Sequence, residues 1–103
     1  MDKVILVYIT IKNEQEAKTI AKALIEKKLI ACANIFPITS LYMWQGKLVD
    51  DKEVVLLAKS KSQNYKKIQS EVKKLHSYQT PCIMNITAQA NPEYLQWLMG
   101  EMK

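Results

Sequence analysis

The alternation of apolar and polar residues predicts four strands along this chain. Residues 4–11 (VILVYITI) are β-branched and apolar at both alternating sets of positions, which is typical of a strand buried on two faces. Residues 31–44 (ACANIFPITSLYMW) form an overlong β-prone run, and residues 47–60 return as its hairpin partner after a turn at Gly46. Residues 82–88 (CIMNITA) supply the fourth predicted strand.

Three further stretches have the spacing of amphipathic helices. Asn13 caps the first, where Glu16 three residues later resembles a capping box. Its apolar stripe repeats at helical spacing: Ala17, Ile20, Ala21, Leu24 and Ile25. Ser62 is placed to cap a second helix, and Pro92 opens a third. We expect one face of the third helix to pack on the sheet as core: Tyr94, Trp97 and Leu98.

The order β-α-β-β-α-β-α predicts a single α+β domain over residues 1–103, a ferredoxin-like sandwich. Its antiparallel sheet has strand order 4-1-3-2, with helices on one face. The strands are apolar on both faces, so the other face would be an apolar patch larger than a monomer usually exposes. The overlong strand lies at a sheet edge and leaves backbone groups to pair. We therefore expect an oligomer with its sheets turned inward, most simply a trimer.

The charge pattern argues against several classes of function. All fifteen basic residues are lysine, and the net charge is +5. Without arginine, bidentate contacts to phosphate or guanine are missing, so we expect no nucleic-acid partner. The same absence argues against an acylphosphatase-like enzyme of this fold, and one histidine without a placed acid is a poor catalytic set. We expect no catalytic reaction.

Two binding modules of this size fit less well. RNA-binding sheets of this fold carry aromatic residues on the third strand, where this chain has VVLL (54–57). Copper chaperones carry Cys-x-x-Cys after the first strand, where this chain reads ITIKNE. The apolar runs are too short to span a membrane, so we expect a cytoplasmic protein in which Cys32 and Cys82 are free thiols.

The segment LHSYQTPCI (75–83) holds the sole histidine of the chain. His76 and Cys82 are suitable ligands for copper or zinc, and they are our predicted metal-binding residues. The alternative interpretation is structural, because the helix dipole alone favours histidine in a last turn. Cys32 should lie at the opposite end of its strand, roughly 15 Å or more from His76, as a small buried residue.

Two aromatic residues should lie at the same end of the sheet as His76. Edge-to-edge pairing of subunits would bring Tyr42 and Trp44 against Tyr78 and Cys82 of the partner subunit. These rings either anchor the subunit interface or, together with Tyr78, wall a small-ligand cleft between subunits.

Four motifs resemble the CutA divalent-cation tolerance family, in the family's order and spacing over essentially the full chain. They are LIACANIFP (29–37), SLYMWQGKL (40–48), LHSYQTP (75–81) and YLQWL (94–98). The resemblance implies a trimeric ferredoxin-like protein with PII-like architecture, linked to tolerance of copper and other divalent metals, and with no established reaction. A trimer that scaffolds or anchors another protein, without a metal role, is the alternative.

This chain departs from the family pattern around the predicted metal site. Family members usually carry proline where Ser77 stands and glutamate where Cys82 stands. Some members also carry a cysteine and a second histidine, at positions that look like Ile9 and Leu75 here. Only His76 of that set is retained, and the thiol at Cys82 would shift the preference toward softer ions.

Overall fold

The computed structural model describes residues 4–103, so the first three residues of the predicted domain lie outside the described residues. The strands and helices follow the predicted order. They are β1 (Val4–Ile11), α1 (Glu14–Glu26), β2 (Cys32–Trp44), β3 (Lys47–Lys61), a 3₁₀ turn (Ser62–Asn64), α2 (Tyr65–Leu75), β4 (Ile83–Ala88) and α3 (Pro92–Gly100).

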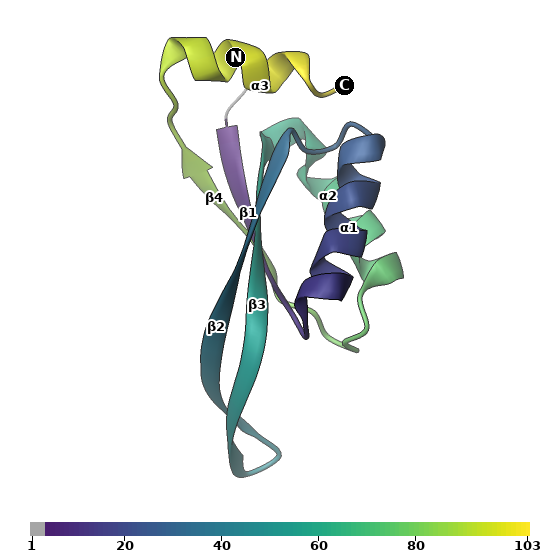
Figure 1. Ribbon diagram of the computed structural model, residues 1–103, viewed down its shortest axis with the longest axis vertical. Helices are drawn as coiled ribbons and strands as arrows, with labels where there is room; N and C mark the ends of the chain where they lie inside the picture. Colours follow the sequence, from purple (N-terminus) through teal and green to yellow (C-terminus); the bar gives the residue numbers. More distant parts are fainter. Residues whose placement is uncertain (1–3) are drawn as a thin grey trace.

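The four strands of residues 4–103 form one antiparallel sheet with the order β2-β3-β1-β4. This is the predicted order read from the opposite edge. Helices α1 and α2 lie together on one side of the sheet, and α3 lies across one end of it (Figure 1). The ferredoxin-like α+β fold is confirmed.

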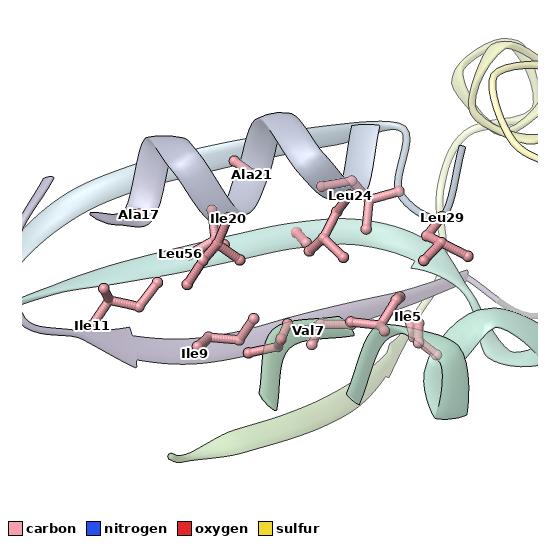
Figure 2. Packing of buried hydrophobic residues seen from close by; sticks show 14 residues of the cluster. Ile5, Val7, Ile9, Ile11, Ala17, Ile20, Ala21, Leu24, Leu29 and Leu56 are labelled. Carbon is pink, nitrogen blue, oxygen red and sulfur yellow. The ribbon is translucent and has the colours of Figure 1, made fainter. Parts of the chain in front are cut away.

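The main core lies between the sheet and α1 and α2. Every second residue of β1 points into it, and these four side chains are at most 2% exposed: Ile5, Val7, Ile9 and Ile11. Figure 2 shows them facing the apolar stripe of α1. Each such side chain contributes about 1.5–3 kcal/mol when it is fully buried. Ile25, predicted as part of the stripe, is instead 43% exposed, because it lies at the margin of the stripe, one residue before the helix ends.

Only one of the two hydrogen bonds of the predicted capping box is present at the start of α1. The side chain of Asn13 accepts a hydrogen bond from the Glu16 N–H at 2.8 Å. The Glu16 carboxylate does not complete a capping box with Asn13. It accepts hydrogen bonds from the backbone N–H (3.2 Å) and the hydroxyl (3.1 Å) of Ser77 instead. Glu16 thus ties the start of α1 to the segment that follows α2.

The predicted cap of α2 by Ser62 is wrong. Ser62 begins the short 3₁₀ turn, and Asn64 occupies the N-cap of α2 without a side-chain cap bond. The Asn64 amide donates instead to the carbonyl oxygen of Leu29 at 3.1 Å, and the Ser60 hydroxyl donates to the same oxygen at 2.6 Å. A buried carbonyl group needs hydrogen-bond partners. The Asn64 side chain therefore bonds to Leu29 and not to the N-terminal N–H groups of α2.

The β2–β3 hairpin extends well beyond the rest of the sheet (Figure 1). The β1–β3 register ends at Ile11 opposite Val54, whereas β2 and β3 stay paired as far as Trp44 opposite Lys47. Residues 38–44 and 47–53 therefore pair only with each other, as a two-stranded ribbon. Gln45 and Gly46 close it with φ values of 50° and 78°, as a type I′ turn requires.

Helix α3 packs less deeply than predicted. Leu98 is fully buried in a second cluster with Val4 and Met102. Tyr94 is half-buried, but Trp97 is 47% exposed, so its assignment to the core is corrected for the single chain. The reason is the position of α3 across the end of the sheet, which leaves Trp97 in contact with the Tyr94 ring, 5.4 Å away, and partly open to solvent.

Candidate functional site

The sheet face opposite α1 and α2 carries exposed apolar side chains. Met84 and Ile86 on β4 and Phe36 on β2 alternate with the core-facing residues of their strands, and they are 52%, 51% and 40% exposed. The predicted apolar face is therefore present in the single chain. The projecting ribbon adds three more exposed side chains on its other face: Leu41, Met43 and Leu48, at 66%, 63% and 71%.

A cleft of about 730 Å³ lies between this ribbon and the segment that leads into β4. Its lining includes all three predicted aromatic residues and the predicted thiol: Tyr42, Trp44, Tyr78 and Cys82. The sequence predicted that subunit pairing brings these side chains together; the structure shows that a single chain already places all four at one cleft, and their contact across a subunit boundary stays a prediction. The segment after α2 returns to the end of the sheet from which the ribbon projects, so one chain supplies both walls.

Two carboxylates in the cleft are bonded to the tyrosines. The Tyr78 hydroxyl donates to Oε2 of Glu53 at 2.6 Å, and the Tyr42 hydroxyl donates to Oδ2 of Asp51 at 3.4 Å. Burial and then the bond to Glu53 raise the pKa of Tyr78. Desolvation and then the charges of Asp51 and Glu53 raise the pKa of Tyr42. Both phenols therefore stay protonated at neutral pH and remain hydrogen-bond donors.

Sequence reasoning missed Asp51 and Glu53. A signal was present in the run DDKE (50–53), because acids two residues apart in a strand share one face. Glu53 is only 8% exposed, so the fold buries one of these acids. Carboxylates are rarely buried unless they are paired, and Tyr78 provides the partner here.

His76 forms the end of α2, and its side chain is completely inaccessible to solvent. Nδ1 accepts a hydrogen bond from the Tyr78 N–H at 3.0 Å. Nε2 therefore carries the ring proton and donates it to the carbonyl oxygen of Thr10 at 2.8 Å. Both ring nitrogens are engaged, so His76 could ligate a metal only by giving up one of these bonds. Its contacts hold Tyr78 in the cleft wall, with the two rings 4.7 Å apart.

The predicted metal-binding pair, His76 and Cys82, stays a prediction. Cys82 is a half-buried free thiol that lines the cleft, whereas His76 is not among the residues of the lining. Among residues 4–103, no three His, Cys, Asp or Glu side chains converge as a group that could hold a metal ion. The donors within residues 4–103 of one chain therefore do not by themselves form a group of three that could hold a metal ion.

Cys32 lies away from the cleft. Cys32 pairs with Lys59 on β3. Thr10, whose carbonyl oxygen bonds to His76, pairs with Val55, four residues away along the same strand. That separation is about 13 Å along the strand. Cys32 is half-buried, which corrects the expectation that it is a fully buried core residue. Cys32 lies on edge strand β2, which has a neighbouring strand on only one side within residues 4–103.

A family model of CutA1 divalent ion tolerance proteins matches residues 5–101. This chain belongs to the CutA family. The divalent-cation tolerance protein CutA of Thermus thermophilus is 47% identical over 100 residues, which are 95% of each chain. The family resemblance of the four motifs is thereby confirmed.

Solved structures of CutA proteins have the same fold. The periplasmic divalent cation tolerance protein CutA from Archaeoglobus fulgidus superposes with a TM-score of 0.94 at 40% identity, covering 97% of this chain and 99% of that one. CutA1 from Oryza sativa superposes with a TM-score of 0.95 at 34% identity, covering 98% and 94%. Since the first of these relatives is described as periplasmic, the cytoplasmic location stays a prediction. In residues 4–103 we find no helix with the length and hydrophobicity needed to cross a bilayer.

Proposed function

We propose that this CutA-family chain is a homotrimer, PII-like in architecture, that binds a divalent cation or a small ligand in the ribbon cleft beside the subunit boundary. Copper is the first candidate ion, and no catalytic reaction is involved. The chain would act in the cytoplasm without a nucleic-acid or membrane partner, and both of its thiols are free in the structure. The family's link to divalent-cation tolerance supports the metal role.

The observation that carries the proposal is the exposed apolar surface. Side chains such as Met84 and Ile86 stand on the open sheet face, and Leu41 and Leu48 stand on the ribbon. Monomers rarely expose large apolar side chains together on one face, as Met84 and Ile86 are exposed on the open sheet face. The protein remains compatible with water if copies of the chain cover this surface for one another.

The ribbon and the sheet edges indicate how copies of the chain would pair. A two-stranded hairpin is marginally stable by itself in water. Residues 38–44 and 47–53 nevertheless pair with no third strand among the residues that the structure describes. Within the described part of the chain, residues 4–103, the outer edges of β2 and β4 pair with no further strand. Pairing edge β2 of one copy with edge β4 of the next is a head-to-tail contact, and three such contacts close a ring.

The metal role is assigned to Cys82. Its thiol lines the cleft near the acids of the ribbon, and thiolates prefer soft ions such as Cu(I). Because three donors do not converge within the described part of one chain, we propose that a partner subunit completes the coordination. The engaged nitrogens of His76 favour the second candidate function, a trimer that scaffolds another protein without a metal role.

Measuring the oligomeric state tests the proposal that copies of the chain cover the exposed apolar surface. We expect light scattering during gel filtration to give three times the chain mass of 11.9 kDa. Ile86→Glu places a charge on the open sheet face and should release monomers or abolish soluble protein. Thr87→Glu, the matched control, places the same charge on the next residue, which is exposed and points to the opposite face, and it should remain trimeric. A stable monomeric wild-type protein at micromolar concentration would refute the proposal.

Metal titration tests the assignment to Cys82. We expect calorimetry to show uptake of about one soft ion per subunit by the wild type and a loss of that uptake in Cys82→Ser. Cys32→Ser removes the other thiol, at the opposite end of the sheet, and should bind as the wild type does. Absence of binding for Cu(I), Cu(II) and Zn(II) in an intact trimer would leave the scaffold as the function.

A further inference from the structure

We propose that the natural ligand of the ribbon cleft is an organic ammonium ion, specifically an aliphatic amine with two charged ends. The inference rests on the small-ligand alternative of the proposed function, in which the cleft holds a molecule rather than a metal ion, and it adds the chemical class of that ligand. It follows from the charge, the aromatic walls and the size of the cleft.

The charge of the lining is opposite to that of the chain. The chain carries fifteen lysines and a net charge of +5, yet the described lining of the cleft contains Asp51 and Glu53 and no lysine. Glu53 is more than nine-tenths buried, so its charge is weakly screened by solvent. A cation that enters the cleft therefore gains more attraction than it would at an exposed carboxylate.

Aromatic side chains make up much of the remaining wall. Tyr42, Trp44 and Tyr78 line the cleft together with apolar atoms of Leu41 and Val49. Ring faces attract ammonium groups, with a gain of about 0.5–2 kcal/mol for each favourable contact. A ligand with a hydrocarbon chain can also bury that chain against the same rings. Rings combined with carboxylates are suited to an organic cation.

Size and hydrogen bonding favour an amine over a bare metal ion. A volume of about 730 Å³ is in the range of small-molecule pockets and far exceeds a single ion. One oxygen of each carboxylate already accepts a tyrosine hydroxyl. The N–H groups of a primary ammonium can use the remaining acceptor capacity, whereas a quaternary ammonium has no N–H to donate. Two carboxylates match an amine with two charged ends.

The test is the binding of 1,4-diaminobutane to the intact oligomer at low ionic strength. Trp97→Phe removes the tryptophan on α3, so that fluorescence reports on Trp44 in the cleft. We expect saturable quenching or enhancement by the diamine, and no response to 1,4-butanediol, a neutral molecule of similar length. Calorimetry on the wild type provides a second readout that does not depend on Trp44.

Matched charge variants locate the binding. Asp51→Asn and Glu53→Gln should each weaken diamine binding by about five- to tenfold, because each removes one charge next to the ligand. Asp50→Asn makes the same change on the adjacent residue, which is exposed and faces the other side of the ribbon. It should change affinity by less than about twofold.

The outcomes separate this inference from the proposed function. No diamine binding by an intact trimer overturns the inference alone. Binding that is equally strong for butanediol, or unchanged in Asp51→Asn and Glu53→Gln, overturns it as well. A monomeric wild-type protein overturns the proposed function on which the inference rests.

Discussion

Replacement of His76 tests whether this histidine is a structural residue or a metal ligand. His76→Ala removes a side chain that is inaccessible to solvent and two hydrogen bonds, of 2.8 Å to Thr10 and 3.0 Å to Tyr78. Each bond contributes about 1 kcal/mol net. The empty space left by the ring adds about 1–2 kcal/mol. We expect a total loss of about 3–4 kcal/mol in the free energy of unfolding.

The assay is urea denaturation followed by circular dichroism, at one fixed subunit concentration because oligomerisation adds to stability. His76→Gln is the control, since its amide keeps a donor near the position of Nε2 and should recover part of the loss. Copper titration of the same folded variants gives the second readout. A structural histidine predicts destabilisation with unchanged metal stoichiometry.

The structural assignment of His76 would be refuted by the opposite pair of results. These are a change in unfolding free energy below about 0.5 kcal/mol, the range of ordinary surface substitutions, and the loss of one bound ion per subunit. They would mean that the ring exchanges its two hydrogen bonds for a metal. The predicted pair of His76 and Cys82 would then be supported.

Two further predictions concern charged groups. Tyr78→Phe removes the hydroxyl that donates to the buried carboxylate of Glu53 and should lower the unfolding free energy by about 1–3 kcal/mol, measured by urea denaturation. Tyr42→Phe, whose bond is longer and more exposed, should cost clearly less, and equal costs would contradict the reasoning. Hydrogen bonds from Lys27 and Lys74 lower the pKa of Glu71, so its stabilising effect is present above the usual glutamate pKa and disappears as the pH falls through the lowered value. The stability difference between wild type and Glu71→Gln should therefore shrink between pH 7 and pH 3, and a difference that grows on acidification would be inconsistent with this sign.

The candidate site was only partly predictable. Tyr42 and Trp44 were selected because chain direction places them at the same end of the sheet as the segment that holds His76, Tyr78 and Cys82. Tyr42, Trp44, Tyr78 and Cys82 do line one cleft. The sequence placed that cleft across a subunit boundary, since sheet order alone does not show how the segment after α2 returns. The path of that segment brings both walls of the cleft together within one chain, and a contribution from a partner subunit stays a prediction.

The pattern of the sequence determined the order of strands and helices, the order of the sheet and its exposed apolar face. These follow from side-chain periodicity and from general rules of chain connection, both of which are local or nearly so. Only the tertiary structure decided that Glu53 meets Tyr78, 25 residues away, and that His76 bonds to Thr10, 66 residues away. Such contacts depend on strand register and on the placement of one loop, and a hydrogen bond forms or fails within a few tenths of an ångström.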